Sequence, residues 1–375
     1  MFNKWYSNSL NSFLIFLYKH KKVTLLSIYH ICFIFFAFYY RTKRGISDAH
    51  YYWAMNFDIS NHSWFEFANY GTKLILFINY PFIKLGLPFW FGFLLYGFIG
   101  FLGILKWIKW TFFVFGDNFY IKNTNVLWVV FYFPNLHFWT ASLGKEPLIF
   151  WGLANLFYAF STKKYFTFSS VIGALIVILI RPHVAFVFFL SCLLIFLFNN
   201  KIKIKIKLWG LLFVFPFFSV LVLMMFRLSK INFFDVNRIV YYNNFSILSF
   251  KNSGSYVPML DYSFSYKLFS FYFRPLFFDN GTLFVKLSSF ENNLFLILVI
   301  AAIYFLLKFK KKIKLTIWFY FSILFTLLLA IMYVNRYANF GIFMRTKMMY
   351  FPFLIVALIY IIKEGCYICK KKIHE

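Results

Sequence analysis

The apolar segments of this chain constrain its fold most, because many of them run for about 15 to 20 residues. A helix rises 1.5 Å per residue, so such a segment crosses or nearly crosses the roughly 30 Å hydrocarbon core of a bilayer. Hydrophobic residues make up 62% of the 375 residues and charged residues only 13%, which exceeds the apolar surface that a soluble chain can bury. The sequence therefore predicts an all-α, polytopic transmembrane helix bundle that forms a single integral membrane domain.

Ten segments have the length and composition of a membrane-spanning helix. They lie roughly at 23–40, 87–105, 125–142, 147–160, 166–180, 184–198, 208–226, 292–307, 315–334 and 348–362. Residues 1–22 are predicted to form an amphipathic helix in the membrane interface. Residues 72–86 are too few to span comfortably and contain Pro81, so we expect a re-entrant or interfacial segment there. The long polar stretch at 227–290 is predicted to form a large outer loop.

Lysine and arginine are distributed unequally between the polar segments. The stretches "KIKIKIK" at 201–207 and "KFKKKIK" at 308–314 indicate the cytoplasmic side, because basic loops are retained there. This predicts an N-in/C-in chain, in which every arginine falls on the outer side: Arg41, Arg44, Arg181, Arg227, Arg238, Arg274, Arg336 and Arg345. The formal net charge of +28 is then explained by contacts with anionic membrane lipids, and nucleic acid is not a predicted partner.

The predicted outer segments also carry the candidate site residues. Asp48 directly follows the first predicted span, and Lys145 and Glu146 occupy the turn between two others. A charge costs much less at such an interface, or in a water-filled cavity, than at the middle of a bilayer. The remaining candidates are Arg181 and His183 of the "RPH" turn, Arg274, Glu291, Arg336 and Arg345.

These acids and cations together suit an anionic, lipid-anchored substrate at the outer interface. Guanidinium and ammonium groups hold phosphate and stabilise the charge that develops on a phosphate leaving group. The predicted phosphate-binding residues are Lys145, Arg181, Arg274 and Arg345, and the secondary residues are His183, Arg336 and Glu291. Asp48 is the predicted base for a sugar hydroxyl, with Glu146 as a second catalytic carboxylate. No metal motif is evident, so no cofactor is predicted, and a divalent cation stays an open alternative.

Each candidate also has a purely structural interpretation that stays open at this point. Asp48 could cap a helix, and Lys145 and Glu146 could form an ion pair at a turn. Arg181 could anchor the chain to lipid phosphate, and Arg274 could brace the loop that contains it. Only the tertiary arrangement decides whether these side chains meet.

Several segments resemble known membrane enzymes. An acid in the first outer loop, here Asp48, is similar to the catalytic base of integral-membrane glycosyltransferases of the GT-C class, whose donors are polyprenyl-phosphate sugars. The segments "FPNLHFWTASLGKEPLIF", "RPH", "FRPLF" and "NFGIFMRTKMMYFPF" are similar to Wzy- and EpsG-type polymerases of bacterial polysaccharide clusters. The chain departs from the common GT-C pattern of two adjacent acids, since no second acid follows Asp48 until Asp58.

The resemblance implies a glycosyltransferase in the inner membrane of a bacterium, where it takes part in surface polysaccharide biosynthesis. Its partners would be a polyprenyl-linked sugar donor, a glycan acceptor and membrane lipids. A single-sugar transferase and an O-antigen or exopolysaccharide polymerase both fit. The alternatives from other classes are a transporter or flippase of a lipid-linked or anionic substrate, and a non-catalytic membrane subunit.

Overall fold

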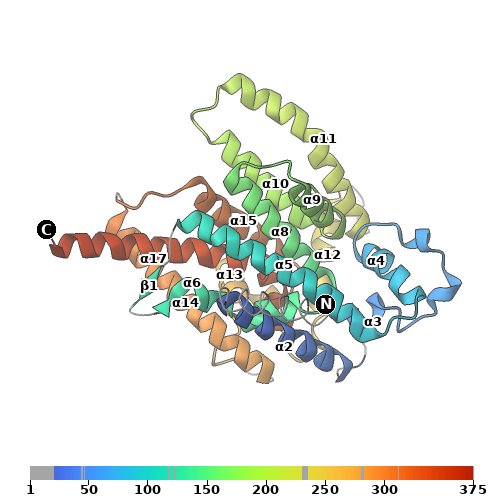
Figure 1. The fold of residues 1–375 in the computed structure, drawn as a ribbon. Helices are drawn as coiled ribbons and strands as arrows, with labels where there is room; N and C mark the ends of the chain where they lie inside the picture. Colours follow the sequence, from blue (N-terminus) through green and yellow to red (C-terminus); the bar gives the residue numbers. More distant parts are fainter. Residues whose placement is uncertain are drawn as a thin grey trace, which may run out of the picture.

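The computed structural model describes residues 21–43, 45, 47–116, 119–121, 124–229, 235–279, 283–310 and 312–374. Helices make up most of this part of the chain, and the predicted helical class is confirmed (Figure 1). The sheet in this part is a two-residue antiparallel ladder between β1 (Tyr120–Ile121) and β2 (Thr124–Asn125). Arg44 and the predicted interfacial helix at 1–22 lie outside the described residues, except for the first two residues of α2.

Six of the described helices are long and apolar enough to cross a membrane. They are α2 (Lys21–Lys43), α5 (Phe89–Phe115), α11 (Ile204–Ser229), α14 (Leu283–Phe309), α15 (Ile317–Val334) and α17 (Phe351–His374). Two shorter apolar helices, α9 (Phe168–Ile180) and α10 (Pro182–Leu197), lie between α8 (Lys145–Thr162) and α11. The helices support a multi-pass membrane protein, whereas the number of about ten spans and the N-in/C-in orientation stay predictions.

The segment predicted as one span at 125–142 is two short helices. These are α6 (Val126–Phe131) and α7 (Pro134–Thr140), and the break between them falls immediately before Pro134. Steric contact with a proline ring disfavours helical geometry in the preceding residue, and Phe133 is accordingly extended, with ψ of 118°. Pro134 can begin α7, because the first residue of a helix has no backbone hydrogen bond to lose.

Two other predicted segments contain regular structure of their own. Residues 72–86 hold one helix, α4 (Thr72–Lys84), which includes Pro81. The predicted loop at 227–290 contains α12 (Val236–Leu248), the short 3-10 helix η3 (Met259–Asp261) and α13 (Phe264–Phe273). The remaining short elements are α3 (Asp48–Tyr52), η1 (Ile59–Asn61), η2 (Trp64–Phe67) and α16 (Phe340–Lys347).

Close helix contacts at glycine hold α8 in the centre of the bundle. A Cβ atom at Gly103 of α5 would lie 3.0 Å from the Cα atom of Trp151 in α8, so a larger residue there would crowd the α8 backbone. At a second contact of α8, a Cβ atom at Gly152 would lie 2.8 Å from the carbonyl oxygen of Gly173 in α9. Small residues at such contacts let membrane helices approach closely, and here they fix α8 and the charged residues at its start.

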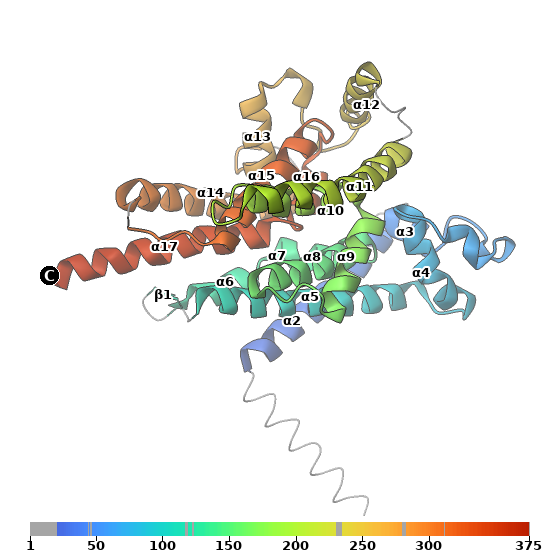
Figure 2. The ribbon, with the colours of Figure 1, turned by 90° about the horizontal axis from the view of Figure 1, so that it is seen from above.

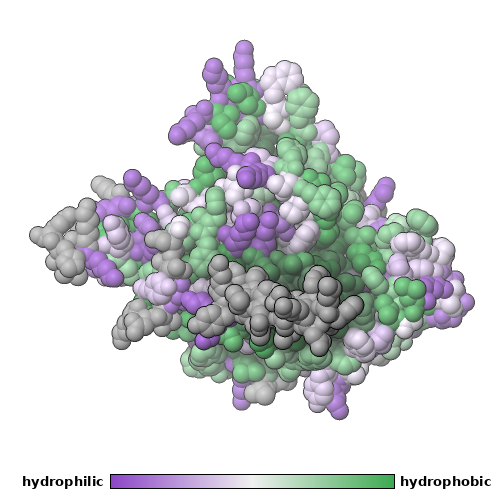
Figure 3. Space-filling view, viewed as in Figure 1, coloured by the Kyte–Doolittle hydropathy of each residue, from purple (hydrophilic) through white to green (hydrophobic). Residues whose placement is uncertain are grey.

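The bundle has a buried centre and an apolar periphery. In the apolar part of α17, 67% of the residues are buried, whereas in α11 only 6% are. Figure 1 shows α11 at the edge of the bundle, and the face in Figure 3 is largely hydrophobic, with hydrophilic residues mainly on its projecting parts. An exposed apolar helix of this length is typical of a surface that contacts lipid. Seen from above, α3 and α4 lie at the opposite side of the molecule from the C-terminal end of α17 (Figure 2).

Candidate functional site

A polar pocket of about 370 Å³ lies between elements that are far apart in the sequence. Its walls come from α3, the start of α4, the start of α8, the junction of α9 with α10, the end of α11, and α16. Most of the predicted site residues line it: Asp48, Lys145, Arg181, His183, Arg336 and Arg345. Glu146 does not line the pocket but is hydrogen-bonded to two residues that do.

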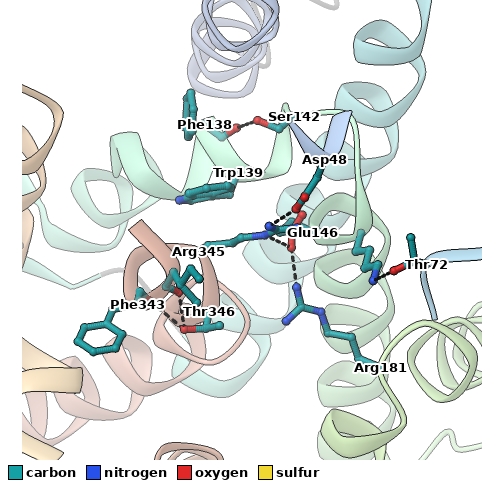
Figure 4. A network of polar contacts seen from close by, with 12 residues as sticks. Asp48, Thr72, Phe138, Trp139, Ser142, Glu146, Arg181, Phe343, Arg345 and Thr346 are labelled. Atoms are coloured by element: carbon teal, nitrogen blue, oxygen red, sulfur yellow. Dashed lines mark hydrogen bonds and ion pairs between the residues drawn. The ribbon is translucent and has the colours of Figure 1, made fainter. Parts of the chain in front are cut away.

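Arg345 joins two carboxylates at this pocket. Its Nη1 donates to Oδ2 of Asp48 at 2.6 Å, across 297 residues of sequence. Its Nε donates to Oε1 of Glu146 at 2.5 Å, across 199 residues. Arg181 reaches the same Glu146 oxygen through Nη2 at 2.6 Å. Figure 4 shows these groups as one connected network, with the ring of Trp139 beside the Arg345 side chain.

Helix boundaries bring these charged groups to the pocket. Pro182 is the first residue of α10, so α9 ends at Ile180 and Arg181 lies at the junction of the two helices. Lys145 begins α8 directly after Gly144, where a Cβ atom would lie 3.2 Å from Oε2 of Glu146. Gly144 therefore leaves room for the Glu146 carboxylate.

The Glu146 carboxylate is almost fully buried, with 3% of the side chain exposed. Burial alone would raise its pKa, but the guanidinium groups of Arg345 and Arg181 outweigh burial and lower the pKa to about 2. A carboxylate that is ionised and paired twice is poorly placed to accept a proton. Glu146 thus holds Arg181 and Arg345 at the pocket, and its catalytic role stays a prediction.

Asp48 has a more open environment. Its side chain is 59% exposed, and its Oδ2 accepts the hydrogen bond from Arg345. Among the described residues, no second hydrogen bond to the Asp48 carboxylate is present. Asp48 is therefore the acid at this site that a substrate hydroxyl can reach.

Lys145 points to the N-terminal end of α4. Its Nζ donates to the hydroxyl oxygen of Thr72 at 2.6 Å. Burial lowers the pKa of Lys145 to about 8, and nearby Arg181 and Arg345 also lower it. Glu146 acts in the opposite direction and raises it. The ammonium group is thus mostly charged at pH 7 and has only a neutral hydrogen-bond partner.

Two predicted secondary residues complete the pocket wall. Nε2 of His183 lies 3.1 Å from the hydroxyl of Tyr333. Arg336 donates through Nη2 to the hydroxyl of Tyr242 at 2.8 Å, and its guanidinium lies 5.0 Å from the centre of the same ring. In the described residues Arg336 has no carboxylate within ion-pair distance, so its charge is not neutralised locally.

Arg274 and Glu291 do not line the pocket. Arg274 pairs with Asp279 through Nε at 3.0 Å and also donates to the hydroxyl of Tyr262 at 3.0 Å. This geometry braces the segment after α13, in agreement with the structural alternative for Arg274. Glu291 is buried in α14, where it accepts a hydrogen bond from the backbone N–H of Asn135 at 2.7 Å.

The structure adds residues that the sequence analysis did not select. Thr72 binds Lys145, and Arg41 lies in the last turn of α2, close to Arg345. Lys347 is buried beside Glu291, and burial lowers its pKa to about 7 although Glu291 opposes this shift. The position of Arg41 at the outer end of the first predicted span, directly before the Asp48 segment, is the signal that could have identified it.

Among the described residues, no three His, Cys, Asp or Glu side chains lie together as a metal site would require. The possible divalent cation therefore stays a prediction with no residues assigned to it.

Comparisons of the chain with protein-family models, with curated proteins and with solved structures find no match. The resemblance to GT-C transferases and to Wzy- and EpsG-type polymerases thus rests on the sequence segments quoted above. The case for a function rests on the pocket.

Proposed function

We propose that this protein is a membrane-embedded glycosyltransferase or polymerase. It would act on sugars linked to polyprenyl phosphate or diphosphate, at the outer face of the bacterial inner membrane, in surface polysaccharide biosynthesis. The observation that carries the proposal is the pocket itself, in which an accessible acid, Asp48, lies beside an excess of cations in an apolar helix bundle.

The charge balance of the pocket favours an anion. The cations Lys145, Arg181, Arg336 and Arg345 outnumber the two carboxylates of Asp48 and Glu146. A pocket of about 370 Å³ is within the usual range for small-molecule sites and is large enough for a phosphorylated sugar headgroup. Neutral partners hold Lys145 and Arg336, so both can bind phosphate without breaking an ion pair.

The proposed reaction uses Asp48 as the base. Asp48 removes the proton from an acceptor hydroxyl, and that oxygen attacks the anomeric carbon of the donor sugar. The bond between the anomeric carbon and the phosphate oxygen breaks, and the phosphate leaves with the electron pair. Lys145, Arg336 and Arg345 stabilise the negative charge on the leaving phosphate.

The ion pair of Arg345 with Asp48 suggests how the base is released. A phosphate competes with the Asp48 carboxylate for the guanidinium, because both are anionic acceptors of the same donor. Substrate binding would then draw Arg345 toward the phosphate and free Asp48 for the hydroxyl. The donor would thus have to bind before the acid is able to act as a base.

The test is surface glycan in cells that carry Asp48→Asn or Arg345→Gln, measured on gels at matched protein levels. Asp261→Asn is the control, because Asp261 is an exposed acid that does not line the pocket. We expect both pocket variants to lose the glycan and the control to keep it. Accumulated single repeat units would indicate a polymerase, and incomplete units a transferase. Normal glycan in both pocket variants would contradict the proposal.

A further inference from the structure

Arg41 differs from Arg181 and Arg345 in forming no ion pair with any of the described residues. Its guanidinium lies 5.3 Å from the centre of the Trp139 ring, and the guanidinium of Arg345 lies 5.7 Å from the same centre. The side chain is partly buried, and its Nε is a buried donor for which the described part of the chain offers no acceptor. No carboxylate of the described residues lies within ion-pair distance of Arg41.

Arg181 and Arg345 are already neutralised, whereas the guanidinium of Arg336, which also lacks a described carboxylate partner, donates to the hydroxyls of Tyr242 and Ser229. Arg345 is paired with Asp48 and Glu146, and Arg181 is paired with Glu146. A phosphate that approached Arg181 or Arg345 would compete with a carboxylate held at 2.5 to 2.6 Å. Arg41 has a buried donor that no described group satisfies, and a phosphate bound at its guanidinium would offset part of the cost of burying that charge.

Arg41 lines neither the polar pocket nor a second, apolar cavity, but its neighbours connect it with both. This second cavity, of about 460 Å³, is lined mainly by apolar side chains of α2, α7 and α14, among them Phe36, Phe138 and Phe284, and its polar lining residues are Asn135, Ser288 and Glu291. Tyr40, the neighbour of Arg41, stacks on Phe284 with ring centres 5.5 Å apart. Trp139, which contacts both guanidiniums, follows Phe138 directly in α7. A phosphate at Arg41 would therefore lie near the apolar cavity, through Tyr40 and Phe284, and near the charged pocket, through Trp139 and Arg345.

We propose that Arg41 is the residue that receives the phosphate of a ligand whose apolar chain enters the cavity between α2, α7 and α14. Arg181 and Arg345 instead keep the two carboxylates in place until the ligand is bound. This inference rests on the proposed function and deepens it, because it assigns a residue to the phosphate and a cavity to the apolar chain of the lipid-linked donor.

The experiment measures binding of farnesyl phosphate to the full chain in detergent by calorimetry. The variants are Arg41→Gln, Arg41→Lys and the control Lys43→Gln. Lys43 belongs to the same last turn of α2 and is exposed, so its replacement removes the same charge without touching the cavity. We expect Arg41→Gln to weaken binding about tenfold or more, as the loss of a charge-assisted hydrogen bond does, and Lys43→Gln to bind like the wild type.

Farnesol and inorganic phosphate separate the contributions of the two ends of the ligand. Arg41→Gln should leave farnesol binding unchanged, because farnesol lacks the phosphate. If Arg41→Gln weakens inorganic phosphate by the same factor, the phosphate site is supported and free phosphate is a sufficient ligand. Arg41→Lys keeps the charge but loses the planar fork, so an intermediate affinity supports a direct contact.

Unchanged farnesyl phosphate binding in Arg41→Gln, or equal loss of farnesol, would overturn the inference. If the wild-type chain binds neither phosphate ligand, the inference and the proposed function both fail. If Arg41→Gln weakens phosphate binding while Asp48→Asn leaves the glycan intact, only the proposed function fails.

Discussion

Two regions of the molecule bury charged groups, and they differ in how these groups are satisfied. In the pocket, Arg345 and Arg181 share the Glu146 carboxylate, cations are in excess, and Asp48 remains 59% exposed. In the second region, which we name the Lys347 cluster, Lys347 donates to Oδ1 of Asn292 and to the carbonyl oxygen of Arg274, both at 3.0 Å. The cluster also includes Glu291 and Asn135, which line the apolar cavity.

The difference shows that burial of charge does not by itself indicate a site. The Lys347 cluster has its donors and acceptors matched by backbone and amide groups, and Lys347 is 1% exposed. The pocket keeps an accessible acid and cations held by neutral hydroxyls. A matched cluster stabilises the fold, whereas an unmatched pocket is able to bind an anion.

The largest expected effect is on activity. Asp48→Asn should lower glycan synthesis by about 10² to 10⁴-fold, because a general base contributes a factor of that size. The free energy of unfolding should change by less than about 1 kcal/mol, since the Asp48–Arg345 pair is largely exposed on the Asp48 side. Glycan ladders and melting curves of the purified protein measure the two quantities, with Asp261→Asn as the control.

Glu146→Gln should act on stability instead. It leaves Arg181 and Arg345 without their shared counter-ion, and breaking a buried pair in this way costs about 3 to 5 kcal/mol. Chemical unfolding in detergent measures the loss. A wild-type unfolding curve together with an inactive enzyme would show instead that Glu146 takes part in the chemistry.

Lys347→Met tests whether the Lys347 cluster stabilises the fold. The acceptors on Asn292 and Arg274 lose their donor, so we expect the free energy of unfolding to fall by about 1 to 3 kcal/mol. Binding of farnesyl phosphate by the folded protein should stay at the wild-type affinity. Weaker binding of farnesyl phosphate at unchanged stability would show that the Lys347 cluster takes part in ligand binding.

The smallest effect is a pH dependence of binding through Lys145. Its pKa in the folded chain is about 8, below its ordinary value of 10.5, so the ammonium loses its proton as the pH rises through 8. Farnesyl phosphate affinity should therefore decline between about pH 7 and 9. We expect a decline of roughly a few-fold, because the pocket loses the positive charge of Lys145. Lys145→Met should bind more weakly at pH 7 and show no such decline. A decline that persists in Lys145→Met would assign the titration to another group.

The lowered pKa of Lys145 also predicts how stability depends on pH. Stability should rise with pH where ligand affinity falls. The unfolded chain binds the Lys145 proton more tightly than the folded chain does. The Lys145 contribution to the free energy of unfolding should therefore rise as the pH increases from about 8 to 10.5. Comparison of wild type with Lys145→Met over this pH range measures the contribution.

Hydropathy was sufficient to predict the helical membrane class, because the length of an apolar segment is a local property. It was less successful with the segment at 125–142, where Pro134 divides the predicted span into α6 and α7. It also gave no sign of the helices α12 and α13 within the predicted loop at 227–290. These elements depend on proline geometry and on packing against neighbours, which a count of apolar residues does not register.

The sequence by itself determined which residues are available near the pocket: an acid after the first span, a Lys-Glu pair at a helix start, and arginine at the ends of other helices. The tertiary structure alone decided which of them meet. Arg345 reaches Asp48 across 297 residues and Glu146 across 199, while Arg41 lies nearby with no carboxylate of the described residues within ion-pair distance. Ion pairing acts over only a few ångströms, so the partner of each charge depends on how α2, α3, α8 and α16 pack, which no local pattern specifies.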